Sequence, residues 1–170
     1  MSNLNSSDNK IAYPGKTFQE SQNYNGFVAL RKDGSVVVWG QTNGIGSIES
    51  SSFSTELQSS VKQIYSCGWG YAALKDDGSV VTWGNAESGG DSSSVSSQLS
   101  SGVTEVHSTA GAFAALKSDG TMVTWGDSNF GGDSSSVQNW LSQCNQGDQI
   151  ITIVSGYSAF AATSTANCDG

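Results

Sequence analysis

One phrase occurs three times along the chain, as FVALRKDGSVVVWG at 27–40, YAALKDDGSVVTWG at 71–84 and FAALKSDGTMVTWG at 113–126. Its tryptophan recurs at intervals of 44 and then 42 residues, as Trp39, Trp83 and Trp125. A fixed period of this size indicates an array of similar units, stacked or arranged around an axis. Residues that recur in every unit are expected first of all to build the unit. A binding site is therefore better sought among the residues that vary.

Each unit has the pattern of short strands joined by a tight turn. Two β-rich runs that meet at Asp-Gly are a strong hairpin signal. The glycine supplies the positive φ that such a turn demands, and it recurs as Gly34, Gly78 and Gly120. Another candidate strand precedes a hairpin at 61–65, 103–107 and 150–154. The sequence therefore predicts three strands in each unit.

The hairpins are separated by the segment Gly-Gly-Asp-Ser-Ser-Ser-Val, at 89–95 and 131–137. Its Asp91 and Asp133 are suited to cap a helix by accepting hydrogen bonds from the first free amides. Apolar residues four apart then share one helical face, as Val95 and Leu99, Val137 and Leu141, and Phe53 and Leu57 do. We predict a helix of about two turns here, docked on the neighbouring unit. One acidic residue in each loop is too few for a calcium site.

The last unit of the array lacks its final segment, and the N-terminus contains a segment that resembles it. The last unit, 150–162, supplies only first strands, and residues 8–15 loosely match the missing Asp-Gly-Ser-Val-Val-Thr-Trp-Gly. We expect one domain, 1–170, of about four units, 16–60, 61–102, 103–149 and 150–170 completed by 8–15. Closure of the ring by this N-terminal strand would hide the sheet edges. An open arc and completion by another copy are the alternatives.

Composition excludes several classes of partner. The 170 residues include 7 basic and 15 acidic side chains, for a net charge of -8. A protein that tracks nucleic-acid phosphates needs a basic stripe, and docking on anionic membranes needs a basic patch. No apolar run reaches the roughly 18 residues of a membrane helix, and the N-terminus lacks the pattern of a signal peptide. We expect a soluble protein without a nucleic-acid partner, and the compartment stays open.

Catalytic residues are not indicated. His107 is the single histidine, so every Ser-His-Asp or Cys-His pair would have to include it. Its place on a predicted strand favours a structural or surface role over that of a base. Asp33, Asp77 and Asp119 recur in the turns, which argues against an acid/base pair. We therefore expect a protein that is not an enzyme and binds no cofactor.

The three cysteines do not have the spacing of a metal site. Cys67, Cys144 and Cys168 contain no Cys-x-x-Cys pair, and one histidine cannot complete an ordinary zinc site with them. Cys67 replaces Thr109 of the next unit, so we interpret it as a small buried residue. A disulfide between Cys144 and Cys168 depends on the compartment and is left open.

Together, the repeated features resemble a known family. Val-x-x-Ile, a turn of small residues, Ala-Ala-Leu-Lys-x-Asp-Gly and Val-x-x-Trp-Gly are similar to the RCC1-type repeat, the blade of regulator-of-chromosome-condensation propellers, over about residues 17–162. The resemblance implies an all-β repeat protein with short inter-repeat helices, an RCC1-like propeller or partial propeller. Family repeats are usually longer and more numerous. The family's nucleotide exchange and chromatin binding are not expected, because this chain has no basic tail and fold alone does not fix function.

Variation between the units points to candidate binding residues. The repeated tryptophans are expected to pack between neighbouring sheets. In contrast, the turns before the Ala-Ala-Leu strands and the loops after Trp-Gly differ from unit to unit, and such loops are where repeat proteins usually bind. The candidates are Tyr24, Trp69, Tyr157, Asn43, Asn85 and Asn129. The equal alternative is that their rings only cover the ends of the barrel or ring.

Two functions fit these features. The first is a non-catalytic protein-interaction module that acts as a scaffold, adaptor or peripheral subunit of a larger assembly. The alternative is a lectin-like module that binds carbohydrate through aromatic and polar rim loops. A multivalent lectin should repeat its polar site in every unit, whereas here the framework repeats and the rim varies. The pattern therefore favours a protein partner.

Overall fold

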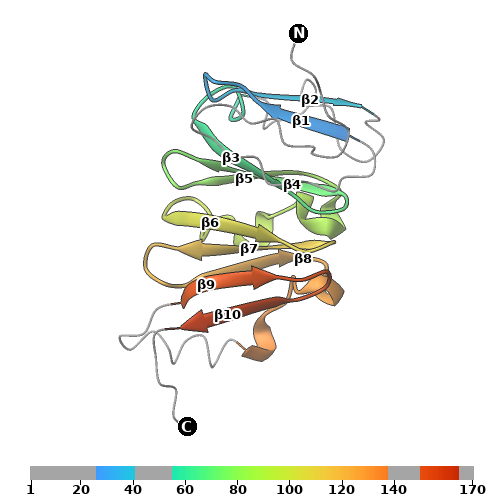
Figure 1. Cartoon of the computed structure of the whole chain (residues 1–170), viewed down its shortest axis with the longest axis vertical. Coiled ribbons are helices and arrows are strands. Elements are labelled where there is room, and N and C mark those ends of the chain that lie inside the picture. The colour runs from blue at the N-terminus through green and yellow to red at the C-terminus, as the bar shows by residue number, and fades with distance from the viewer. Residues whose placement is uncertain (1–25, 41–54, 138–149, 165–170) are drawn as a thin grey trace.

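The strands form small antiparallel sheets that follow the order of the chain. The computed structural model describes residues 26–40, 55–137 and 150–164. Within these ranges the sheets are β1–β2, β3–β4–β5, β6–β7–β8 and β9–β10. The strands are β1 (Gly26–Leu30), β2 (Val36–Gly40), β3 (Val61–Ser66), β4 (Gly70–Lys75), β5 (Val80–Gly84), β6 (Val103–Ser108), β7 (Ala112–Lys117), β8 (Met122–Gly126), β9 (Ile150–Ser155) and β10 (Phe160–Ser164). The sheets lie one above another, with β1–β2 at one end and β9–β10 at the other (Figure 1).

The Asp-Gly hairpins form as predicted. The turn glycines have positive φ angles of 81°, 79° and 81°, at Gly34, Gly78 and Gly120. In the second unit the Asp77 carboxylate accepts hydrogen bonds from the Ser79 amide at 2.9 Å and hydroxyl at 2.7 Å. These bonds, the hydroxyl first, lower the pKa of Asp77. The same arrangement joins Asp33 to Ser35 and Asp119 to Thr121.

Each hairpin turn is also joined to the next unit. The carbonyl of its glycine accepts a hydrogen bond from the first strand that follows, in the pairs Gly34–Val61 at 3.0 Å, Gly78–Val103 at 2.9 Å and Gly120–Ile150 at 3.2 Å. A Cβ atom on Gly78 would lie 2.9 Å from the amide nitrogen of Gly102. The turn therefore requires glycine twice, for its φ angle and for the close approach of the neighbouring backbone.

A pair of stacked aromatic rings on each interior sheet packs against the preceding sheet. Tyr71 and Trp83 stack with ring centroids 5.2 Å apart, and both are buried against Leu30 and Val36 of the first sheet. Hydrophobic burial of rings this large contributes much of the favourable free energy of a core. The prediction that the repeated tryptophans pack between sheets is confirmed at Trp83.

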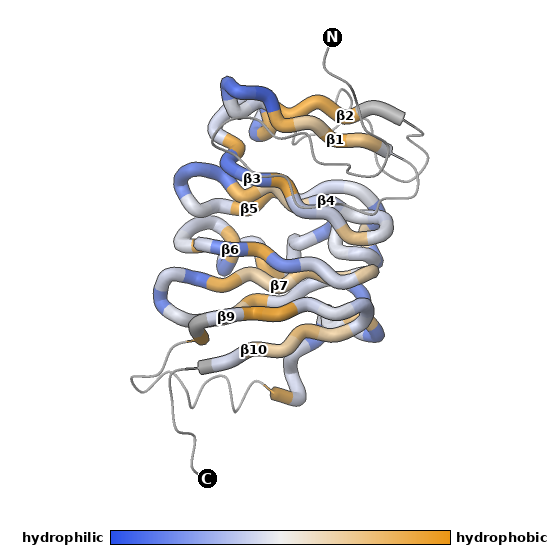
Figure 2. The backbone as a smooth tube through the Cα atoms, in the orientation of Figure 1, coloured by the Kyte–Doolittle hydropathy of each residue, from blue (hydrophilic) through white to orange (hydrophobic). Residues whose placement is uncertain are grey.

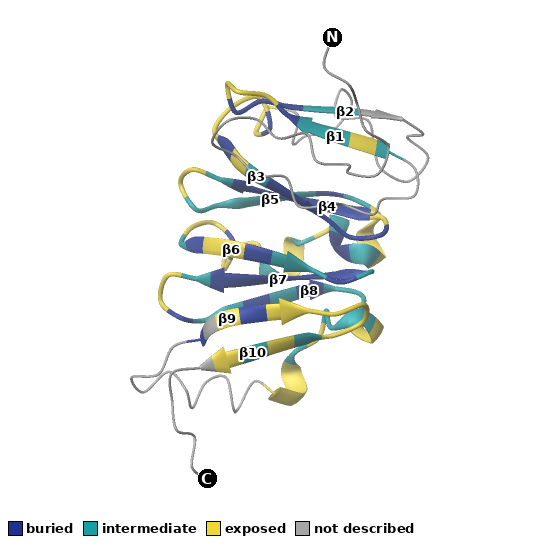
Figure 3. Cartoon of the chain, in the orientation of Figure 1, coloured by how far each residue is buried: buried dark blue, intermediate teal, exposed yellow. Residues whose placement is uncertain are grey.

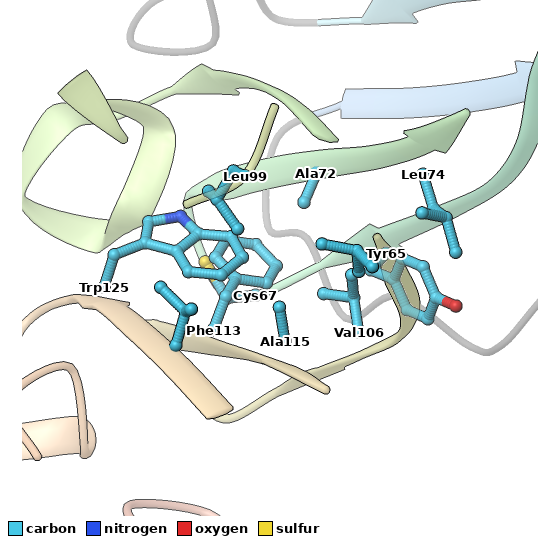
Figure 4. Close-up of a cluster of buried hydrophobic side chains, with 11 residues drawn as sticks. Tyr65, Cys67, Ala72, Leu74, Leu99, Val106, Phe113, Ala115 and Trp125 are labelled. Carbon is cyan, nitrogen blue, oxygen red and sulfur yellow. The ribbon is translucent and has the colours of Figure 1, made fainter. Parts of the chain in front are cut away.

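The same contact recurs one sheet further along the stack. Phe113 and Trp125 stack at 5.4 Å and pack against Ala72 and Leu74 of the preceding sheet (Figure 4). Tyr65 lies in this cluster as well, and its burial raises the pKa of the phenol to about 12. The core is thus a series of similar inter-sheet layers, with buried strands at the centre of the stack (Figure 3).

The Gly-Gly of the connecting segment covers the aromatic pair of the next sheet. The two glycines are the last residues of the helical turn η2 (Ala86–Gly90), and Gly89 has a φ of 83°. The indole Nε1 of Trp125 donates a hydrogen bond to the Gly89 carbonyl at 3.0 Å, and a Cβ on Gly89 would lie 2.7 Å from the Phe113 ring. The sequence suggested only a loop here, because the ring that requires the glycine lies far along the chain.

The inter-repeat helix predicted after Asp91 is shorter than expected. One 3-10 turn, η3 (Ser93–Val95), is followed by an irregular turn in which the Val95 carbonyl accepts hydrogen bonds from the Gln98 and Leu99 amides. After Asp133 the described residues end with η5 (Ser135–Val137), so the helix predicted there stays a prediction. Asp91 accepts a hydrogen bond from the Ser93 amide at 2.9 Å, as predicted, and Leu99 is buried in the core that Val95 also contacts. After Asp91 the prediction of two regular helical turns was wrong because this serine-rich segment has weak helix propensity. The Ser96 and Ser100 hydroxyls also bond to backbone carbonyls within the segment.

Several expectations fall on residues outside the described ranges. These are the closing strand 8–15, the pairing of Cys144 with Cys168, and the helical contacts of Phe53 and Leu141. Ring closure therefore stays a prediction, and the disulfide stays an open question. In the described part of the chain, no helix is long and apolar enough to cross a membrane.

We predict that Trp83→Ala lowers the free energy of unfolding by about 3–5 kcal/mol, because it leaves a cavity beside Tyr71 at the centre of an inter-sheet layer. Urea unfolding followed by circular dichroism measures the change. Trp69→Ala is the matched control, since that ring is 42% exposed and should lose little stability. An unchanged midpoint for Trp83→Ala would contradict this account of the core.

We predict that Gly78→Ala destabilises the protein more than Gly102→Ala. Both glycines have positive φ, so each substitution carries the strain of a left-handed alanine, about 1–2 kcal/mol. A Cβ at Gly102 meets only side-chain atoms at 3.5 Å or more, whereas one at Gly78 meets backbone at 2.9 Å. The difference between the two unfolding free energies measures the contribution of the close contact between units at Gly78. Equal losses of stability in the two variants would contradict that contribution.

Candidate functional site

The turns that precede β4, β7 and β10 form a row along one side of the stack. They are residues 67–69, 109–111 and 156–158. The Gly68 amide donates to the Ala110 carbonyl at 2.8 Å, and the Ala110 amide donates to the Tyr157 carbonyl at 2.9 Å. We call this row, with the adjoining η2 and η4 (Ser128–Phe130), the turn edge. Short helical turns mark it on the right of Figure 1.

Two of the predicted aromatic residues are exposed on the turn edge. The side chain of Trp69 is 42% exposed and that of Tyr157 is 76% exposed. Tyr157 is supported by Phe130, whose ring meets it edge-on with centroids 6.0 Å apart. In the next units the position of Trp69 is occupied by Gly111 and Ser158. The aromatic residues of this edge therefore do not repeat, although the backbone beneath them does.

A buried side chain clamps each of the first two turns of this row. The Cys67 sulfur accepts a hydrogen bond from the Gly70 amide at 3.1 Å and donates to the Ser88 carbonyl at 3.0 Å. Thr109 Oγ1 makes the corresponding bonds in the next unit, at 3.1 and 2.8 Å. Burial raises the pKa of the Cys67 thiol. The interpretation of Cys67 as a small buried residue is confirmed, and its bonds give it a specific role.

The two described asparagine candidates order the loops of this edge. Asn85 Oδ1 accepts a hydrogen bond from the Ser88 amide at 3.0 Å, and Asn129 Nδ2 donates to the Asp127 carboxylate at 3.0 Å. The loops are held against the turns by backbone bonds, from the Asn85 amide to the Trp69 carbonyl and from the Asp127 amide to the Gly111 carbonyl. Both asparagines thus lie beside the aromatic turns but use part of their amides internally.

The structure brings four of the six predicted site residues to one edge. These are Trp69, Tyr157, Asn85 and Asn129. Tyr24 and Asn43 lie outside the described residues. Sequence reasoning missed the supporting role of Phe130, which is set by its contact with Tyr157 across two units. Its only sequence signal was an aromatic residue in a loop that varies.

Charge is distributed unequally between the two sides of the stack. The five described lysine and arginine residues all lie at or beside the hairpin turns on the opposite side, which we call the hairpin edge: Arg31, Lys32, Lys62, Lys75 and Lys117. The turn edge carries Glu87 and Asp127 instead. Figure 2 shows the hydrophilic hairpin turns on the left. Among described residues, the turn edge is therefore acidic.

The single histidine lies beside a carboxylate of its own strand. His107 Nε2 is 3.3 Å from the Glu105 carboxylate, and both residues belong to β6. No group of three or more His, Cys, Asp or Glu side chains in this part of the chain could hold a metal ion.

The comparisons with known proteins agree with the fold. No protein-family model matches the chain, and no curated protein is similar to it. The CRINKLY WD40 ectodomain of the Arabidopsis thaliana receptor kinase ACR4 is 16% identical with a TM-score of 0.52, and the match covers 89% of this chain and 47% of that one. Human WBSCR16 is 18% identical with a TM-score of 0.55, covering 89% and 46%.

These matches bear on the architecture only. At this identity they show the fold alone, an all-β arrangement of small antiparallel sheets similar to part of a WD40-type propeller domain. The chain spans about half the length of the solved structures that it matches. The prediction of an all-β repeat protein is confirmed at this level, and a partial propeller agrees with it.

We predict that Cys67→Ala lowers the free energy of unfolding by about 1–3 kcal/mol, because the buried Gly70 amide loses its acceptor. Cys67→Thr should retain most of the stability, since Thr109 makes both bonds in the next unit. Thermal unfolding of the two variants provides the measurement. Equal losses would show that the hydrogen bonds are not what Cys67 contributes.

Proposed function

We propose that this chain is an RCC1-like repeat module that docks a protein partner through its turn edge and carries out no catalysis. The observation that carries the proposal is the exposure of Trp69 and Tyr157 on a row of turns joined by backbone hydrogen bonds. Exposed Trp and Tyr side chains on a rigid frame are typical anchors of protein interfaces. Such a module acts as a scaffold, adaptor or peripheral subunit of a larger assembly.

The rigidity of the turn edge favours binding. The turns are fixed to one another through Gly68, Ala110 and Tyr157, and the Tyr157 ring rests against Phe130. Because these groups are already ordered, little conformational entropy remains to be lost on association. Between Trp69 and Tyr157 the row contains the small Ala110 and Gly111, and the Phe130 ring packs over Gly111.

The charge of the turn edge indicates the chemistry of the partner. Glu87 and Asp127 accompany the aromatic rings, while the described basic residues lie at the hairpin edge. The chain as a whole carries a net charge of -8. A partner segment that presents Lys or Arg beside apolar side chains would be steered to this edge, and its binding would weaken as salt rises.

Carbohydrate is the second candidate ligand, because the exposed rings of Trp69 and Tyr157 could stack on a sugar. Two observations make it the weaker one. The position of Trp69 is Gly111 in the next unit, so the edge does not offer one site per repeat. Asn85 and Asn129, the amides that would read sugar hydroxyls, already bond within their own loops.

We predict that Trp69→Ala and Tyr157→Ala each weaken binding to the partner by about 30-fold or more, the effect of removing an aromatic anchor worth about 2 kcal/mol. The tagged chain captures the partner from native extract, mass spectrometry identifies it, and calorimetry with the purified partner gives the affinities. Lys62→Ala at the hairpin edge is the matched control and should bind like the wild type.

Three outcomes separate the proposals. A stoichiometric protein that both edge variants lose and Lys62→Ala retains supports docking at the turn edge. A protein bound equally by every variant would place the interface elsewhere on the chain. Capture of material that free sugar elutes, without a protein partner, would instead support the lectin.

A further inference from the structure

The interfaces between successive sheets all use the same two faces. One face of each sheet, which we call the aromatic face, carries the Phe or Tyr that begins the Ala-Ala-Leu strand and packs on the sheet before it. The opposite face, which we call the forward face, carries the next residue of that strand and packs against the sheet that follows. For example, Ala114 and Leu116 on the forward face of β7 pack against Ile153 of β9. Every interior contact therefore joins a forward face to an aromatic face.

The aromatic face of the first sheet carries an exposed ring. Phe27 is the counterpart of Tyr71 and Phe113 in the repeated phrase. Those two rings are fully buried, whereas Phe27 is 59% exposed. A side chain that the repeat buries elsewhere is thus presented to solvent at the end of the stack formed by β1 and β2 (Figure 3).

The forward face of the last sheet carries exposed side chains as well. Val154 is the counterpart of Tyr65, which is buried, yet Val154 is 59% exposed. On the neighbouring strand β10, Ala161 and Thr163 are exposed although their counterparts one sheet earlier, Ala114 and Leu116, are buried. Exposed large apolar side chains that a repeat otherwise covers mark an interaction surface.

We propose that these two end faces are one interface divided between two copies, and that two chains close head to tail into a ring. The forward face of each copy's last sheet would receive Phe27 of the other copy. The contact would continue the forward-to-aromatic packing that already joins the sheets within the chain. A head-to-tail contact closes into a ring when its rotation allows, and two copies then form two identical interfaces.

The size of the chain fits a ring of two copies. The chain matches 46% and 47% of the length of two propeller-like structures, so two copies supply about one such structure. Four sheets in each copy give eight in the ring, within the roughly four to eight blades of propellers. The first and last sheets lie at opposite ends of the stack (Figure 1), which places them to meet a second copy.

Light scattering coupled to size exclusion, over roughly a hundredfold range of protein concentration, tests the proposal on the 170-residue chain. We expect a species of twice 17.6 kDa that dissociates on dilution. Phe27→Asp and Val154→Asp should each shift the chain to the monomer, because each places a charge in both interfaces. Ala86→Asp, an exposed alanine of η2 away from the end faces, is the matched control and should stay dimeric.

Mixing the two variants tests the direction of the contact. A dimer of one Phe27→Asp chain and one Val154→Asp chain has both charges in a single interface, so the other interface is wild type and dimer should partly return. Circular dichroism of each variant checks that it is folded. A wild-type monomer at every concentration, as when residues 8–15 close the ring, would overturn the proposal. Dimers that only Phe27→Asp disrupts, or open-ended larger oligomers, would also overturn it.

Discussion

The packing of an aromatic pair against the preceding sheet is the contact on which the stack depends. Tyr71 with Trp83, and Phe113 with Trp125, present almost the same surface to the sheet before them. Small sheets of two or three strands cannot bury both faces alone, so each is stabilised by its neighbours. The glycine-rich connections, through Gly89 above the Phe113 ring, close each layer without space for a side chain.

The contrast between the packed layers and the turn edge explains which positions can differ from unit to unit. Residues in the layers and hairpin turns are fixed by burial and by φ, whereas the turn edge needs only a backbone row and a clamp such as Cys67 or Thr109. Within that row Trp69 and Gly111 occupy equivalent positions, and the Phe130 ring packs where a side chain on Gly111 would lie. A repeated frame with an edge that differs from unit to unit suits recognition of one particular partner.

The sequence predicted the features that depend on local residue chemistry and on the repeat period. The strands, the Asp-Gly turns with positive φ at Gly78, and the burial of Trp83 all followed from the repeated phrase. The helix after Asp91 was predicted too long, because Val95 and Leu99 are spaced as on a helix while serine hydroxyls bond to the backbone between and after them. The contact of the Gly-Gly connection with the next unit could not be predicted, since the ring that requires Gly89 belongs to the next sheet.

Amide hydrogen exchange of the dilute chain tests most directly whether contacts between sheets, rather than the sheets themselves, hold the fold. We predict slowest exchange in the central strands β4 and β7, which have a neighbour on both faces, and faster exchange in β1 and β10 at the ends of the stack. Equal protection of all four strands would contradict this account, because it would mean that the end sheets are as well covered as the interior ones.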